Sequence, residues 1–343
     1  MKFRLLGRSG LRVSELALGT MTFGPEWGWG ASRDESRRMF DAYVHAGGNF
    51  LDTANNYTNG TSERYVGEFT KSDRDHFVIA TKFTMAERPG DPNFAGNHRK
   101  NMLRSLEGSL RRLATDRVDL LWVHAWDFTT PVEEVLRALD DAVRQGKVLY
   151  IGISDTPAWI VARANTIADL RGWSRFVGLQ LRYSLIDRTA ERELLPMARA
   201  LDLGVTPWSV LGAGVLTGKY SRGTPPAEGR AKQGAATVER NLEIARTVVG
   251  IAEEIGCTPG QIAIAWARQQ PGVIVPLIGA RNGEQLSDNL GALHVTLAGG
   301  QLQTLDTASA VDLGFPHNFL GQDAIKKIVY GGAHADIVNH RER

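Results

Sequence analysis

The 343-residue sequence contains one cysteine, Cys257, and has no run of 18 consecutive apolar residues. A single cysteine excludes an intrachain disulfide, and the missing apolar run argues against a membrane-spanning helix. The amino terminus also lacks an apolar stretch of signal-peptide length. We therefore expect a protein of a reducing compartment, the cytoplasm, with no membrane partner.

The sequence also lacks a large excess of either positive or negative charge. Lysine and arginine together number 40, aspartate and glutamate 38, and the formal net charge is +2. This balance gives no reason to expect nucleic acid as a partner, and basic pairs such as Arg111 and Arg112 are interpreted as solvated helix surface. Hydrophobic residues make up 43% of the chain, which is enough for a large core.

A short apolar run followed by an amphipathic segment is the pattern that repeats along the chain. The turn glycines Gly7 and Gly10 predict a β-hairpin before the first repeat. The predicted strands cover residues 16–21, 48–52, 77–82, 118–124, 148–154, 177–181, 204–209 and 272–279. The predicted helices cover residues 33–46, 62–70, 97–113, 131–145, 157–170, 189–201, 239–255 and 284–291, with an extra helix at 259–269.

Eight nearly uniformly apolar strands that alternate with helices predict a parallel sheet covered by helices. A doubly wound sheet commonly carries Gly-x-Gly-x-x-Gly after its first strand, and "GTMTFGPEWGWG" at that place lacks this spacing. The pattern favours one α/β domain, residues 1–343, folded as a (β/α)8 TIM barrel with an N-terminal β-hairpin. Residues 221–236 predict a long loop, and the C-terminal extension, about residues 300–343, is expected to pack across an end of the barrel.

Polar side chains end several of the predicted strands. Asp52 ends the second strand and is followed by Tyr57 in the next loop, whereas Lys82 and His124 end the third and fourth strands. Each residue alone could cap a loop or lie in the core. Because the active site of such a barrel lies at the carboxyl ends of its strands, the four together predict one catalytic site.

These four side chains favour the donation of a proton to an oxygen atom. The ammonium of Lys82 would lower the pKa of the Tyr57 phenol, and Asp52 would hold the ammonium in place. His124 would orient the oxygen, and hydride from a nicotinamide is the natural complement. A metal site made of Asp52, His124 and Asp127 is the alternative. HxH and HExxH pairs are missing, however, and Lys82 would repel a cation, so we expect no metal.

Several longer segments, in the same order, resemble the aldo-keto reductase family over nearly the whole chain. They include "GGNFLDTANNYTNGTSERYVG", "VIATKF", "VHAWD", "PWSVLGAGVLTGKY" and "IGARNGEQLSDNL". The segment "GISDTPAW" resembles the aryl-alcohol dehydrogenase-like branch. The resemblance implies a barrel that reduces aldehydes or ketones with NADPH. Tyr57 would be the general acid, Asp52 and Lys82 would tune it, and His124 would orient the carbonyl group.

The resemblance also implies how NADP(H) would bind. Ser154 and Gln180 would hold the carboxamide, Trp208 would stack on the nicotinamide, and Arg281 would pair with the 2′-phosphate. Asp155 stands where the family often has asparagine, and a carboxylate cannot donate to the carboxamide oxygen. The implied cofactor-binding residues are Gly19, Thr20, Met21, Asp52, Ser154, Asp155, Gln180, Trp208, Ser209, Val210, Leu211, Gly212, Gly214, Lys219, Ile278, Gly279, Ala280, Arg281, Gln285 and Asn289.

Aromatic residues near the predicted strand ends favour a small apolar or aromatic carbonyl compound as the substrate. Relatives that resemble potassium-channel β-subunits keep the cofactor but act through a partner, so a redox-sensing regulatory subunit is the alternative function. Either function allows a homo-oligomer. The implied substrate-binding residues are Trp27, Trp29, Tyr57, Phe83, His124 and Trp126.

Overall fold

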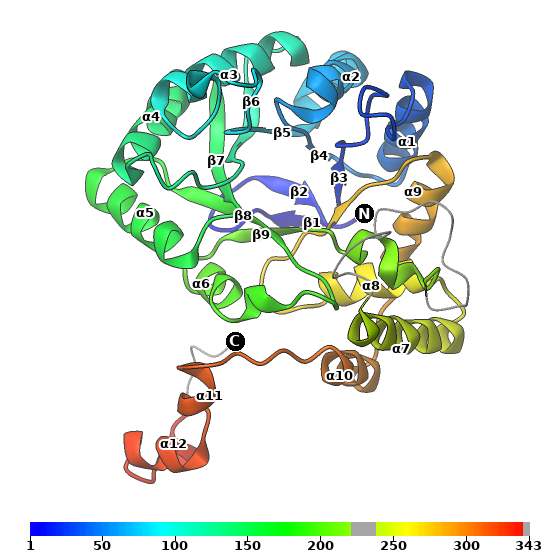
Figure 1. Cartoon of the computed structure of the whole chain (residues 1–343), viewed down its shortest axis with the longest axis vertical. Helices are drawn as coiled ribbons and strands as arrows, with labels where there is room; N and C mark the ends of the chain where they lie inside the picture. Colours follow the sequence, from blue (N-terminus) through cyan, green and yellow to red (C-terminus); the bar gives the residue numbers. More distant parts are fainter. Residues whose placement is uncertain (221–237, 339–343) are drawn as a thin grey trace.

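A closed barrel of eight parallel strands forms the centre of the computed structural model, which describes residues 1–220 and 238–338 (Figure 1). The sheet order is β10-β3-β4-β5-β6-β7-β8-β9, and a bridge between Val205 and Ile274 closes the ring. The predicted (β/α)8 barrel is confirmed. Its strands are β3 (Ala17–Gly19), β4 (Phe50–Asp52), β5 (Val78–Phe83), β6 (Val118–Val123), β7 (Val148–Ser154), β8 (Phe176–Arg182), β9 (Gly204–Trp208) and β10 (Leu277–Ile278).

Helices surround the strands, and the predicted N-terminal hairpin is present as an antiparallel pair, β1 (Phe3–Leu5) and β2 (Arg12–Ser14) (Figure 1). The α-helices are α1 (Arg33–His45), α2 (Thr61–Thr70), α3 (Arg99–Leu113), α4 (Val132–Arg144), α5 (Ala158–Arg171), α6 (Leu194–Ala200), α7 (Glu239–Ile255), α8 (Pro259–Arg268), α9 (Gly283–Leu290), α10 (Gly299–Ala308), α11 (His317–Leu320) and α12 (Asp323–Val329). In the described part of the chain, none of them is both long and apolar enough to cross a membrane.

The inside of the barrel is filled around Trp122 of β6. A Cβ atom added to Gly152 of β7 would lie 2.3 Å from the Trp122 ring, and one added to Gly178 of β8 would lie 2.8 Å from it. Leu6 and Val13, from the hairpin region, join this inner apolar cluster. Side chains that alternate with the inward-facing ones pack outward against the helices. The carboxyl ends of the strands are therefore where polar side chains can gather.

Two predicted elements differ from the structure at prolines. The predicted helix 189–201 is divided into a 3₁₀ turn, Thr189–Glu191, and α6, because Pro196 fits only the first turn of a helix. The predicted strand 272–279 shrinks to Leu277–Ile278, with Pro276 just before it. Proline has no backbone N–H to donate, so it limits ladder pairing at that position.

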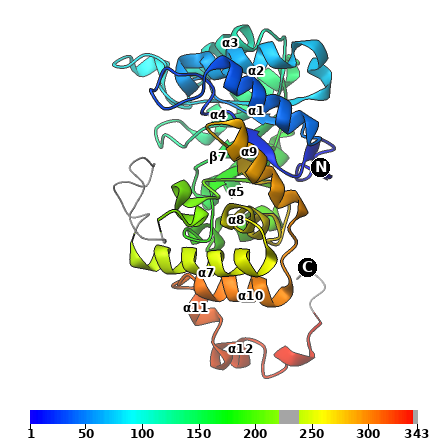
Figure 2. The ribbon, with the colours of Figure 1, turned by 90° about the vertical axis from the view of Figure 1, so that its right-hand side faces the viewer.

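The C-terminal extension was expected to pack across an end of the barrel, but it does not. Helix α10 lies along α7 with Leu305 fully buried, and residues 315–338 then project away from the barrel (Figures 1 and 2). Arg192 and Arg240 bind the backbone oxygens of Asp312 and Ala310, which directs the chain outward. The predicted loop 221–236 lies outside the described residues.

The tight fit around Trp122 gives a test of the barrel interior. Gly152→Ala should destabilise the protein by roughly 1–3 kcal/mol, because the added methyl group overlaps a buried indole. The free energy of unfolding in urea measures this. Gly250→Ala on α7 is the matched control, since a Cβ there meets nothing within 4 Å and should raise stability by up to about 1 kcal/mol. Equal effects of the two variants would contradict the packing described.

Candidate active site

A buried ion pair joins the carboxyl ends of β4 and β5. Asp52 and Lys82 are both fully buried, and Lys82 Nζ donates to Asp52 Oδ1 and, over 2.7 Å, to the backbone oxygen of Thr53. The second carboxylate oxygen, Oδ2, accepts from Gln180 Nε2 of β8 at 3.0 Å. The two charges are therefore matched and hydrogen-bonded, which a buried ion pair requires.

Tyr57 lies over this pair. The chain turns back after β4, and Lys82 Nζ is 4.8 Å from the centre of the Tyr57 ring. The turn depends on left-handed backbone at Thr58 and Asn59, with φ of 45° and 54°. Thr58 Oγ1 stabilises it by donating to the backbone oxygen of Phe23 at 2.5 Å and accepting from the backbone N–H of Ser62 in α2.

The pKa of the Tyr57 phenol is raised above its ordinary value. Burial raises it most, Lys82 opposes this increase, and Asp52 adds to it. The sequence predicted that Lys82 would lower this pKa, and Lys82 does act in that direction. The larger effect of burial, which was not predicted, raises the pKa overall. Burial alone would lower the pKa of Lys82, but Asp52 and Tyr57 raise it by more than burial lowers it. Lys82 is therefore an ammonium, and Tyr57 a protonated phenol, at neutral pH.

His124 follows β6 and lies beside Tyr57, with 5.8 Å between the two ring centres. Burial, and next the charge of Lys82, lower the pKa of His124 to about 3. The imidazole is therefore neutral at pH 7. Its Nδ1 atom is buried without a hydrogen-bond partner in the described structure. Because Nδ1 has no acceptor, the proton of the neutral ring is better placed on Nε2.

Three strands contribute a second row of polar side chains at the same end of the barrel. Register pairs Ser154 of β7 with Gln180 of β8, and Gln180 with Thr206 of β9. Ser154 Oγ is buried and has no partner in the described structure. Next to this row, Trp208 Nε1 donates to Asp155 Oδ1 at 3.1 Å, which orients the indole.

The chain after β9 forms a concave turn of backbone. Ser209, Gly212, Ala213 and Gly214 all have left-handed φ angles, between 54° and 91°. A backbone of this form can point several N–H groups at one anion. Leu211 is half-buried here, Val210 is packed in the core, and Lys219 is exposed.

Two of the predicted cofactor-binding residues on α9 make hydrogen bonds to the backbone of the preceding loop. Gln285 Oε1 accepts from the backbone N–H of Arg281 at 3.0 Å, and Asn289 Nδ2 donates to the oxygen of Gly279 at 3.2 Å. Arg281 is half-buried. Ile278 and Ala280 belong to the core.

The loop after β3 brings aromatic rings to Tyr57. The ring of Trp27 is 6.3 Å from that of Tyr57 and 5.6 Å from that of Trp29. Trp126, after β6, is half-buried. Phe83, the last residue of β5, is only 1% exposed and packs outward in the apolar layer between strands and helices.

The start of the same loop is partly structural. Thr20 is buried and donates to the backbone oxygen of Asp52 at 3.0 Å, whereas Gly19 and Met21 beside it are half-buried. Thr20 therefore supports the ion pair from the side of β3.

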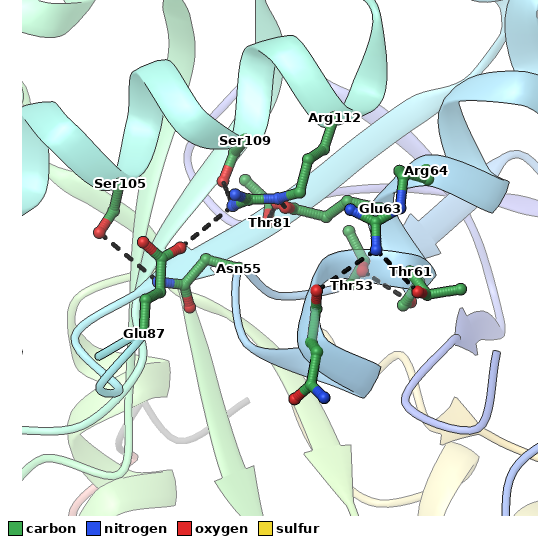
Figure 3. Close-up of polar contacts among 12 residues, drawn as sticks. Thr53, Asn55, Thr61, Glu63, Arg64, Thr81, Glu87, Ser105, Ser109 and Arg112 are labelled. Carbon is green, nitrogen blue, oxygen red and sulfur yellow. Dashed lines mark hydrogen bonds and ion pairs between the residues drawn. The ribbon is translucent and has the colours of Figure 1, made fainter. Parts of the chain in front are cut away.

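A polar network that the sequence analysis missed joins α2, α3 and β5 (Figure 3). Glu63 of α2 is fully buried and accepts from Arg112 Nε of α3 and from Thr81 Oγ1 of β5, over 2.5 Å in each case. Arg112 also donates to Glu87 in the loop after β5, at 3.1 Å. The interpretation of Arg112 as solvated surface was wrong, although Arg111 is exposed.

This network ties α2, which begins directly after the Tyr57 turn, to α3 and β5. Glu63 lies on the same buried face of α2 as Val66 and Gly67. A charged residue at that place in a helical pattern was the available signal. Because Thr81 directly precedes Lys82, the contact from Glu63 also fixes the end of β5.

Among residues 1–220 and 238–338, no group of three or more histidine, cysteine, aspartate or glutamate side chains could hold a metal ion.

Comparison with known proteins identifies the family of this chain. The model of the Aldo/keto reductase family matches residues 15–310. A norsolorinic acid reductase of Aspergillus flavus is 41% identical over 330 residues, which cover 92% of this chain and 83% of that protein. A putative aryl-alcohol dehydrogenase of Saccharomyces cerevisiae is 37% identical and covers 94% and 90%, and an aryl-alcohol dehydrogenase [NADP(+)] of Phanerodontia chrysosporium is 36% identical with the same coverage.

The fold and the comparisons together identify an oxidoreductase built on a TIM barrel. The chain belongs to the aldo/keto reductase family.

The buried network that joins α2, α3 and β5 should matter to stability. Glu63→Ala leaves Arg112 without its buried partner and should lower the free energy of unfolding by roughly 2–4 kcal/mol. Glu68→Ala is the control, because its pair with Arg33 is half-exposed and should contribute less than about 1 kcal/mol. Urea denaturation of both variants measures the difference, and losses of the same size would show that the network is not specially stabilising.

The neutral state of His124 predicts a pH dependence of stability. Its folded pKa of about 3 lies below the unfolded value of about 6.5, so the unfolded state binds a proton first as the pH falls. Stability from this residue is complete above about pH 6.5 and decreases below it, by on the order of 1–2 kcal/mol at pH 5. His124→Gln should lose less stability between pH 7 and pH 5 than the wild type. An identical loss in both proteins would contradict the assignment.

Proposed function

We propose that this chain is an NADPH-dependent reductase that converts aldehydes or ketones, with apolar or aromatic groups, into alcohols. The observation that carries the proposal is the buried Asp52–Lys82 pair beneath the Tyr57 ring, with neutral His124 beside it. The names of the relatives support chemistry between carbonyl compounds and alcohols, and one relative is named for NADP(+).

Tyr57 is the proton donor in this proposal. Its raised pKa keeps the phenol protonated at neutral pH, so the proton is present when a substrate oxygen becomes negative. Lys82 then stabilises the phenolate that remains. Because that interaction strengthens only as the proton leaves, it acts on the transition state more than on the bound substrate.

Asp52 keeps Lys82 in position. Its two oxygens take hydrogen bonds from Lys82 and from Gln180, so the ammonium cannot turn away from the phenol. His124 has a different part, because a neutral imidazole can donate a hydrogen bond to the carbonyl oxygen without competing with Tyr57 for the proton.

The residues at the strand ends fit a nicotinamide dinucleotide. Ser154 Oγ is a buried hydroxyl without a partner, which a carboxamide would satisfy, and Trp208 is held by Asp155 where a flat ring could stack. The left-handed backbone at 209–214 suits a pyrophosphate, and Arg281 suits a 2′-phosphate. When bound, NADPH supplies the hydride that the carbonyl carbon receives.

Trp27, Trp29 and Trp126 form the substrate side of the proposed site. The rings of Tyr57 and Trp27 meet edge to face, with an interplanar angle of 79°. Apolar surface beside a proton donor favours substrates with an aromatic or other apolar group next to the carbonyl.

The decisive experiment compares the wild type with Tyr57→Phe. Purified protein is mixed with NADPH and a panel of aromatic aldehydes, and the loss of NADPH absorbance is followed. Tyr57→Phe should reduce kcat/KM by about 10²–10⁴-fold, the usual contribution of a general acid. The dissociation constant of NADPH, measured by tryptophan fluorescence, should stay unchanged. Tyr65→Phe is the matched control, because Tyr65 lies on α2 and packs against Phe69 instead.

Three other outcomes would contradict the proposal. Absence of NADPH binding would reject the reductase and the redox-sensing subunit together. Turnover unaffected by Tyr57→Phe would reject Tyr57 as the proton donor. Tight NADPH binding without turnover on a broad panel would favour the redox-sensing subunit.

A further inference from the structure

The C-terminal arm, residues 315–338, is unusually rich in exposed apolar side chains. Half of the sixteen exposed large apolar side chains of the described chain fall in these 24 residues. The other eight are scattered over the barrel domain, with at most two on any one helix or strand. Those of the arm are Phe315, Phe319, Leu320, Ile328, Val329, Tyr330, Ile337 and Val338.

The base of the arm is fixed to the barrel domain. Arg192 donates to the backbone oxygen of Asp312 at 2.9 Å, and His317 Nε2 is 3.1 Å from Glu193 Oε1. Both contacts come from the segment just before α6. The arm therefore leaves the domain in a defined direction, beyond α10 and away from the strands (Figures 1 and 2).

The two short helices of the arm lack the packing that helices of this length require. Helix α11 has 4 residues and α12 has 7, whereas isolated helices shorter than about 12–15 residues are marginal in water. No arm residue belongs to an apolar cluster of the described chain. The arm makes local ring contacts, such as Phe315 with Phe319 at 6.2 Å, but these bury little surface.

Helix α12 has an apolar face on one side. Ile325, Ile328 and Val329 are spaced so that they lie together, and the charged Lys326 and Lys327 interrupt this pattern on the other side. Ile328 is 76% exposed and Val329 is 63% exposed. An apolar face of this kind indicates contact with another protein surface.

We propose that the arms of two copies of this chain pack against each other about a two-fold axis, with the apolar face of α12 at the centre. A two-fold interface uses the same patch on both copies, and the arm carries half of the exposed large apolar side chains of the described chain. Asp323 and Asp336 balance Lys326 and Lys327, so the arm has no excess positive charge that would favour an anionic membrane or nucleic acid.

The available area agrees with a stable dimer. Each apolar side chain of this size buries roughly 60–120 Å², so eight of them offer on the order of 500–950 Å² per copy. A stable interface buries about 800 Å² per partner. This inference does not depend on the proposed reductase activity.

Analytical ultracentrifugation of the full chain tests the proposal. The wild type should have the mass of two copies over a dilution series. The double variant Ile328→Asp/Val329→Asp should weaken the dimer by about a hundredfold or more, the scale expected when central interface residues are lost. Leu170→Asp is the matched control, because Leu170 is 81% exposed on α5, outside the arm, and its replacement should leave the mass unchanged. The milder Ile328→Ala/Val329→Ala should weaken the dimer less and serves if the charged variant aggregates.

Hydrogen exchange of residues 323–330 gives a second readout. These amides should be protected in the wild-type dimer and exchange rapidly in the double variant, with the barrel strands unchanged. A wild type that remains a single copy would overturn the proposal, whether its arm is protected by its own barrel or not. A dimer that survives the double variant would place the interface elsewhere and would overturn it as well.

Discussion

The buried pair of Asp52 and Lys82 is the interaction on which the site depends. Moving two charges out of water costs several kcal/mol for each ion, and the cost is offset only when geometry and hydrogen bonding are good. Here the backbone oxygen of Thr53 and the amide of Gln180 complete the coordination of both groups. Residues from three strands, β4, β5 and β8, must therefore come together, which the closed barrel achieves.

The ion pair can influence the Tyr57 phenol only if Tyr57 is held in a fixed position. The turn that carries Tyr57 contains left-handed residues, which are strained for a threonine such as Thr58. The hydrogen bonds of Thr58 Oγ1 with Phe23 and Ser62 offset this strain. Glu63, Arg112 and Thr81 connect α2, which follows the turn, to α3 and β5 (Figure 3). The ionic network is thus placed where movement of one helix would displace both the phenol and the ammonium.

Much of the fold and the centre of the site could be predicted from the sequence, because both depend on local patterns. Apolar runs ending in Asp52, Lys82 and His124 specify where strands reach the edge of a parallel sheet. Phe83 shows the limit of that reasoning, since a residue next to Lys82 in a strand must face the other way. For Phe83, the alternation of side chains along a strand is a stronger signal than its place beside Lys82.

Long-range pairing was harder to predict. Glu63 and Arg112 are separated by 49 positions, and nothing in either local sequence names the other as its partner. The C-terminal extension posed the same difficulty, because its apolar residues predict burial without indicating which surface buries them. Proline effects at Pro196 and Pro276 are local by contrast, and a stricter use of the missing N–H would have corrected both elements.

In the proposed mechanism, the electrostatics of Tyr57 explain how one ammonium can assist a proton donor without removing its proton in advance. If Lys82 alone acted on the phenol, the pKa would fall and part of the tyrosine would be ionised before a substrate arrived. Burial and the charge of Asp52 oppose this, so the phenol keeps its proton. In the proposed reaction, the attraction of Lys82 then acts when negative charge develops on the phenol oxygen. Such a site favours the transition state over the resting state because its charges are balanced beforehand.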